Sequence, residues 1–154
     1  MAIGRVLAVD YGQKRTGLAV CDPLGIIASP LTALVTEDLE ETVQGIVRHV
    51  QERDVRIVLV GMPFLPDGRE GAQVQIVRLF LGALRAALPA NVGLLERDER
   101  HTTHEANSLL REGGFNRRRA KEHVDSVAAV VILREYLQEM DRPGPPPDET
   151  RGDG

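Results

Sequence analysis

The sequence predicts an α/β fold with a five-stranded mixed sheet, in which three antiparallel strands are followed by two helix–strand units. Three strand-like segments lie close together near the N-terminus, and such short spacing favours antiparallel neighbours. Two later strand candidates each follow a helical pattern, and a helix is the usual connection between parallel strands. One of these strands, Val55–Gly61, is nearly continuously apolar, as expected in the buried middle of a sheet.

The first three strands are expected at residues 4–10, 17–22 and 26–33, with turn residues such as Asp22-Pro23-Leu24-Gly25 between them. A helix is expected at residues 37–53, where apolar residues recur at helical spacing. The strand at residues 55–61 then leads through a Pro/Gly loop, residues 62–71, into a helix at residues 72–87. The fifth strand is expected at residues 92–97. Helices should therefore flank the sheet.

Two further helices are expected after the fifth strand. Thr102 and Glu105 have the spacing of a capping box and should open a short helix that ends at Gly113-Gly114. A last helix is expected at residues 117–139, and it should be buried because residues 127–133 are apolar almost all round. The Pro/Gly-rich tail, residues 141–154, has no core-forming residues and should be disordered.

Length and composition indicate one globular domain, residues 1–140, because 154 residues with 42% hydrophobic and 27% charged residues are ordinary for such a domain. No apolar run is long enough to span a bilayer, and no signal peptide precedes the first strand. The single cysteine, Cys21, excludes an internal disulfide and fits a small core residue in a reducing compartment. These observations predict a cytoplasmic protein with no membrane partner.

Asp10 is the most informative residue, because it carries a carboxylate from the end of the first strand directly into a glycine turn. A strand end holds such a group rigidly. Lys14 and Arg15 follow at once. An acid beside two cations suits metal-dependent phosphate chemistry, in which the acid holds the ion and the cations meet the phosphate. The alternative is a hairpin whose strand ends in an aspartate, a common turn residue.

Other acids stand where they could join Asp10. Asp98 and Glu99 follow the fifth strand, and Asp125 precedes the apolar stretch of the last helix. If the first strand is central and the fifth runs parallel beside it, these acids emerge at one edge, where the last helix can supply Asp125. Three carboxylates suit one or two Mg²⁺ or Mn²⁺ ions. Alternatively, Asp98 and Glu99 are surface residues, and Asp125 only complements its helix dipole.

Several separate segments, in order, match one known family. They are Asp10-Tyr11-Gly12 with Lys14, Arg15 and Gly17; Val60-Gly61-Met62-Pro63 with Asp67-Gly68; Arg78 with Phe80; Asp98-Glu99-Arg100 with Thr102-Thr103 and Glu105-Ala106; Gly113-Gly114; and Lys121 with Asp125-Ser126 and Ala128-Ala129. From about residue 5 to residue 139 the chain resembles the YqgF/RuvX family, described as Holliday junction resolvases or pre-16S rRNA processing nucleases.

The resemblance implies an RNase H-like fold and an acidic triad of Asp10, Glu99 and Asp125. Asp98 competes with Glu99 for the middle place, because only one of two adjacent side chains at a strand end should point at the site. We favour Glu99 and keep Asp98 as a possible metal ligand.

The basic residues form two groups beside these acids, and both are expected to contact nucleic acid. The net charge of −4 argues against coating nucleic acid by general attraction, so binding needs a local patch. The densest run precedes Asp125 and consists of Arg117, Arg118, Arg119 and Lys121. The second group lies beside the other acids and consists of Lys14, Arg15 and Arg100. The alternative for the dense run is a solvated charged face. With 3% aromatic residues and no Trp, recognition should rest on backbone and shape.

These features together predict a metal-dependent nuclease. The resemblance supports two substrates, the 5′ end of pre-16S rRNA, which we favour, and branched DNA. Single-stranded nucleic acid is a further candidate. A resolvase must cut two strands symmetrically and should be a homodimer, whereas a monomer favours RNA. Two other classes remain open: a non-catalytic RNA-binding ribosome-assembly factor, and an ATP-binding protein, which would need a second such domain.

Overall fold

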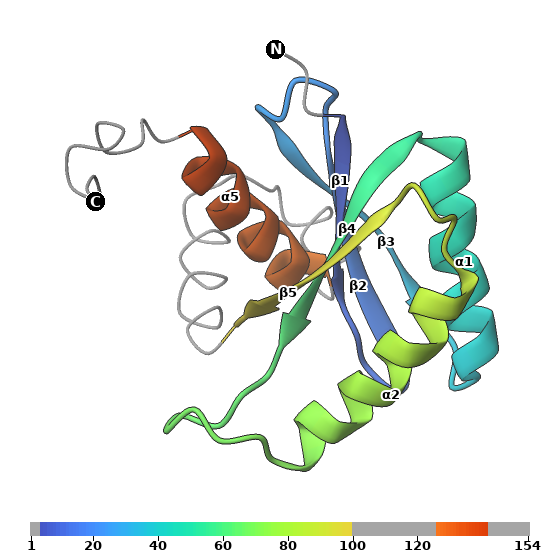
Figure 1. Ribbon diagram of the computed structural model, residues 1–154, viewed down its shortest axis with the longest axis vertical. Coiled ribbons are helices and arrows are strands. Elements are labelled where there is room, and N and C mark those ends of the chain that lie inside the picture. The colour runs from blue at the N-terminus through green and yellow to red at the C-terminus, as the bar shows by residue number, and fades with distance from the viewer. Residues whose placement is uncertain (1–3, 100–125, 142–154) are drawn as a thin grey trace, which may run out of the picture.

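The computed structural model describes residues 4–99 and 126–141, and within them five strands form one mixed sheet (Figure 1). The strands are β1 (Arg5–Asp10), β2 (Arg15–Cys21), β3 (Ala28–Val35), β4 (Val55–Met62) and β5 (Gly93–Asp98), in the spatial order β3-β2-β1-β4-β5. β1 and β3 each run antiparallel to β2, and β4 runs parallel to both β1 and β5. The predicted mixed sheet is confirmed.

Helices cover both faces of this sheet (Figure 1). On one face lie α1 (Leu39–Glu52) and α2 (Ala72–Ala87), which pack on alternate strand residues such as Leu7, Val9 and Val60. On the other face lies α5 (Val127–Asp141), which packs on the intervening residues, such as Val6, Ala8 and Leu59. The apolar stretch of α5 is buried, as predicted. No helix in the described ranges has the length and apolar content to cross a membrane.

The third strand begins two residues later than expected, because Asp22 holds the preceding turn. Its carboxylate accepts hydrogen bonds from the backbone N–H groups of Ile26, at 2.7 Å, and Ile27, at 2.8 Å. Both isoleucines are therefore exposed turn residues, and β3 starts at Ala28. Periodicity alone gave no sign of this side-chain contact.

The position of the fifth strand also differs from the prediction. β5 is parallel to β1, as expected, but β4 lies between them. The expectation that these two strands are direct neighbours was wrong, because the apolar β4 pairs along β1 and β5 is added outside it. Neighbouring strands lie about 4.8 Å apart, so β1 and β5 are separated by about 10 Å. Acids at their ends must reach across β4 to meet.

Ser126 fixes the start of α5 to the sheet. The pairing of β2 with β3 shifts register between Thr16 and Leu18. At this irregularity the fully buried Ser126 hydroxyl accepts a hydrogen bond from the Leu18 N–H, at 3.1 Å, and donates one to the Leu31 carbonyl, at 2.7 Å. The residue that follows Asp125 in the sequence is thereby held against β2 and β3.

Candidate active site at the carboxyl edge of the sheet

Asp10 lies at the carboxyl end of β1 on a rigid turn. The next side chain, Tyr11, stacks on Phe80 of α2 with ring centroids 4.2 Å apart and planes 9° apart. In the turn itself, a Cβ on Gly12 would lie 2.3 Å from the carbonyl oxygen of Arg15, so only glycine fits there. The Thr16 hydroxyl donates to the Gly12 carbonyl at 3.2 Å. These contacts fix the backbone that follows the carboxylate.

Glu99 reaches the same edge from β5. Its backbone N–H donates to the Met62 carbonyl at 3.1 Å, which continues the pairing with β4 beyond the last strand residue. Its carboxyl is half-buried and lies against Gly61 of β4, because a Cβ on that glycine would be 2.9 Å from the Glu99 carboxyl carbon. The carboxyl is also hydrogen-bonded to Asp10. The acids of β1 and β5 therefore meet across β4.

Asp98 is exposed, although its charge contributes to the raised pKa of Glu99. Alternation along β5 explains the difference, because successive strand residues point to opposite faces. Arg97 pairs with Glu139 and Glu135 of α5 on one face. Glu96 lies 3.5 Å from Arg78 of α2 on the other face. Glu99 shares the face of Arg97, whereas Asp98 shares the face of Glu96.

The environment of Glu99 strongly favours its protonated form. Burial raises the pKa of Glu99 to about 8, and the charge of Asp10, the hydrogen bond with Asp10 and the charge of Asp98 act in the same direction. At neutral pH without a cation, we therefore expect the hydrogen-bonded pair of Glu99 and Asp10 to hold one proton between them. A pair of carboxyl groups that shares one proton can exchange that proton for a metal cation.

The other predicted site residues are only partly covered by the described ranges. Lys14 is exposed in the turn that follows Asp10, and Arg15 is exposed at the start of β2, at the same edge of the sheet. Outside the described residues lie Asp125, Arg100, Arg117, Arg118, Arg119 and Lys121, together with the predicted helix at 102–114, the first part of the last helix and the tail. Within the described residues, no group of three or more His, Cys, Asp or Glu side chains is placed to hold a metal.

Gly61 is a site residue that sequence reasoning missed. From the sequence it was placed at the end of an apolar strand and within a family-matching segment, but it was given no role in the site, whereas it lies directly beneath the Glu99 carboxyl. A glycine within an otherwise apolar strand is itself a sign of close approach by another group.

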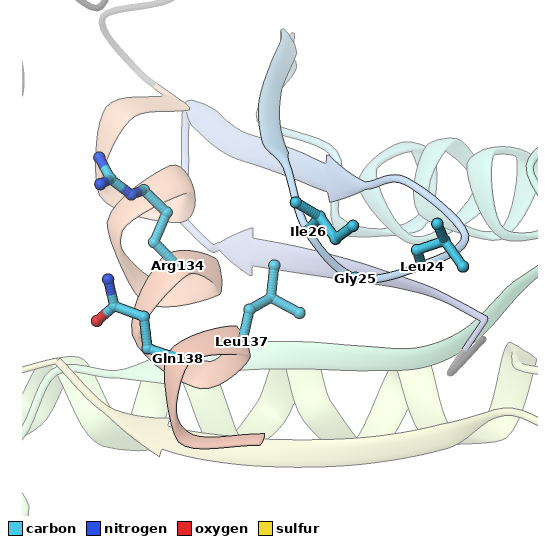
Figure 2. Close-up of a pocket in the computed structure, with 6 residues that line it drawn as sticks. All are labelled: Leu24, Gly25, Ile26, Arg134, Leu137 and Gln138. Atoms are coloured by element: carbon cyan, nitrogen blue, oxygen red, sulfur yellow. The ribbon is translucent and has the colours of Figure 1, made fainter. Parts of the chain in front are cut away.

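A pocket of about 270 Å³ lies far from these acids (Figure 2). It is formed between the β2–β3 turn and α5, and Leu137 of α5 points toward the turn. Because β2 runs antiparallel to β1, this turn lies at the opposite end of the sheet from Asp10. The pocket is therefore separate from the candidate active site.

Comparisons with known proteins support one family. The family model described as "RuvX: Holliday junction resolvase" matches residues 4–139. A protein of Chloroflexus aurantiacus (strain J-10-fl) is 39% identical over 132 residues, which cover 86% of this chain and 85% of the relative. A protein of Syntrophus aciditrophicus is 37% identical over 144 residues, 94% of this chain and 95% of the relative. Both relatives are named "Putative pre-16S rRNA nuclease".

Two solved structures share the fold. A Thermus thermophilus RuvC structure matches with a TM-score of 0.58 and 19% identity, over 88% of this chain and 95% of that one. The fowlpox virus resolvase, solved with Holliday junction DNA, matches with a TM-score of 0.58 and 10% identity, over 90% of this chain and 99% of that one. At such low identity these matches show the fold alone, and they confirm the RNase H-like fold that the family resemblance implied.

Proposed function

Because this chain belongs to the RuvX family, we propose that it is a metal-dependent nuclease that processes the 5′ end of pre-16S rRNA in the cytoplasm. The observation that best supports this proposal is the meeting of Asp10 and Glu99 across β4 at the carboxyl edge of the sheet. Two carboxyl groups from separate strands are held together there at a half-buried position. Such an arrangement is unfavourable for two negative charges unless a proton or a cation lies between them.

The residues at this edge fit a divalent cation. Their donor atoms are carboxylate oxygens, which Mg²⁺ and Mn²⁺ prefer. The elevated pKa of Glu99, about 8, reflects burial and nearby negative charge, and a cation would relieve the repulsion. We propose that Asp10 and Glu99 hold the ion together with Asp125, and that Asp98 contributes its charge from the exposed side. When bound by these acids, a divalent ion would supply an activated water and stabilise the charge that develops on a phosphodiester.

The basic residues have a different role in this proposal. Lys14 and Arg15 are exposed one turn after Asp10, where they would neutralise phosphates of a bound strand. We propose the same role for Arg100 and for the run Arg117, Arg118, Arg119 and Lys121 on the grounds of sequence alone. Contacts of this kind position the backbone and carry no base preference. The substrate would therefore be selected by its shape and by the accessibility of the strand.

Branched DNA is the second candidate substrate, because the description of the matching family names a Holliday junction resolvase. The two substrates make different demands on assembly. Symmetric cutting of a junction needs two active sites and hence a homodimer, whereas cutting one RNA strand needs a single site.

One substrate panel separates these candidates. The protein is incubated with a labelled precursor 16S rRNA 5′ leader, with plain single strands and with a four-way DNA junction, in Mn²⁺, Mg²⁺ or EDTA. Metal-dependent cutting of the RNA leader supports rRNA processing. Paired symmetric cuts in the junction, together with a dimer in solution, support the resolvase instead. Binding of RNA without cutting of any substrate would replace the nuclease by an assembly factor.

A further inference from the structure

The acids meet at a place where the intervening strand carries no side chain. β4 lies between β1 and β5, and its residue at this level is Gly61, which pairs with Arg97 on β5. The preceding residue, Val60, pairs with Val9 of β1, the residue before Asp10. Because Asp10 and Glu99 come from strands about 10 Å apart, their carboxyl groups can meet only above β4. The surface of β4 at that point decides whether they do.

There is no space for a side chain on Gly61. A Cβ built on this glycine would lie 2.9 Å from both the carboxyl carbon and Oε1 of Glu99, and 2.7 Å from Cδ1 of Ile132 on α5. Both distances are shorter than any ordinary carbon contact. Ile132 is fully buried in the core beneath α5, whereas Glu99 is only half-buried at the edge. The Glu99 side chain is therefore the neighbour with room to move away.

We propose that Gly61 is a positioning residue for catalysis. Because it has no side chain, it leaves the space through which the Glu99 carboxyl crosses β4 and reaches Asp10. The inference rests on the proposed function, in which Glu99 is one of the acids that hold the cation. A methyl group at position 61 displaces the Glu99 carboxyl from Asp10 and separates the two carboxyl groups that hold the ion. The fold tolerates this displacement, because the end of the Glu99 side chain turns outward.

The contact with Ile132 supplies a matched control. If Gly61 matters only because a methyl group would press on α5, shortening Ile132 should correct the defect. The change I132V removes Cδ1, the atom of Ile132 that a Cβ at position 61 would meet at 2.7 Å. In G61A/I132V one methyl group is gained and one is lost, so the volume of the core is conserved. The contact with the Glu99 carboxyl remains.

The experiment compares wild type, I132V, G61A, G61A/I132V and G61A/I132V/E99D. Cleavage of a labelled single-stranded RNA, Mn²⁺ binding by calorimetry and the thermal midpoint are measured for each. We expect I132V to cleave like wild type and G61A to lose about 10²-fold in kcat with KM unchanged. G61A/I132V should regain the thermal midpoint lost in G61A but neither kcat nor Mn²⁺ affinity. The shorter acid of E99D should then raise kcat by roughly tenfold in this background, because it clears the new methyl group.

Two results of the cleavage assay would overturn the proposal. One is wild-type kcat in G61A, and the other is recovery of kcat in G61A/I132V to the level of I132V, which would reduce Gly61 to a packing residue. A crystal structure of G61A/I132V tests the placement without any activity: an unmoved Glu99 carboxyl contradicts it. Full cleavage by a folded E99Q variant would instead refute the proposed role of Glu99. The crystal structure would still test whether Gly61 sets the position of the Glu99 carboxyl.

Discussion

Replacing Glu99 with glutamine should make the metal-free protein more stable at pH 8 and leave its stability near pH 4.5 almost unchanged. In the wild type, burial and the adjacent Asp10 raise the pKa of Glu99 from 4.5 to about 8. Between these values the folded protein holds a proton that the unfolded chain has lost. The free energy of unfolding therefore falls as pH rises from about 4.5 to about 8, and this effect is complete above pH 8. Glutamine does not titrate, so the E99Q variant lacks this decline.

The size of the effect follows from the pKa shift. A rise from 4.5 to about 8 corresponds to roughly 5 kcal/mol at about 1.4 kcal/mol per pH unit. Glu99 is only half-buried, so water and side-chain rearrangement reduce this figure, and we expect E99Q to gain about 2–4 kcal/mol at pH 8. Asp10→Asn removes the neighbouring charge but not the burial, which is the largest cause of the shift. That variant should show a smaller decline, but not its complete loss.

Urea unfolding followed by circular dichroism from pH 4.5 to pH 9, in the presence of a chelator, measures these differences. Asp98→Asn is the matched control: this exposed acid is adjacent in sequence, and its charge is the smallest of the causes that raise the pKa of Glu99. The free energy of unfolding of this variant should depend on pH in the same way as that of the wild type. Parallel curves for wild type and E99Q would show that Glu99 titrates normally, and the reasoning about the carboxyl pair would be refuted.

Three further substitutions and one control variant test the residues that support the site, each by urea unfolding. Phe80→Ala should lower the free energy of unfolding by about 3–5 kcal/mol through a core cavity, whereas Leu79→Ala, on the exposed side of the same helix, should change it by less than about 0.5 kcal/mol. Ser126→Ala leaves a buried N–H and a buried carbonyl without their partner and should cost about 1–3 kcal/mol. Arg97→Ala should cost about 1 kcal/mol at low salt and less in 1 M NaCl, because its ion pairs to α5 are partly exposed. Equal losses for the two α2 variants, no loss for Ser126→Ala, or a salt-independent loss for Arg97→Ala would contradict these assignments.

Element order was predictable because apolar periodicity and turn residues act locally. The nearly continuous apolar run at residues 55–61 predicted a buried strand, and β4 is one. The start of β3 was not predictable in this way, since it depends on a side chain: Asp22 captures two backbone N–H groups that the apolar pattern had assigned to the strand. Hydrophobic periodicity does not predict a strand boundary that is set by a single polar contact.

The candidate site was predictable in its residue types but not in its geometry. The sequence predicted that Asp10 and Glu99 lie at one edge of the sheet, because each follows or ends a strand and parallel strands end at the same edge. The place of β4 between those strands is a property of the sheet order, which local patterns do not encode. The role of Gly61 followed only from that order. Likewise, the structure shows Glu99 beside Asp10 and Asp98 exposed, which required the register of β5.

Cleavage of a labelled precursor 16S rRNA 5′ leader by wild type and Asp10→Asn, in Mn²⁺, Mg²⁺ or EDTA, is the most direct test of the central claim. The two proteins are first matched by circular dichroism and by their affinity for the uncut RNA. We expect the wild type to cut only with a divalent ion and the folded variant to bind without cutting, because one of the two carboxylates that meet across β4 is gone. Full metal-dependent cutting by a well-folded Asp10→Asn protein would contradict the account.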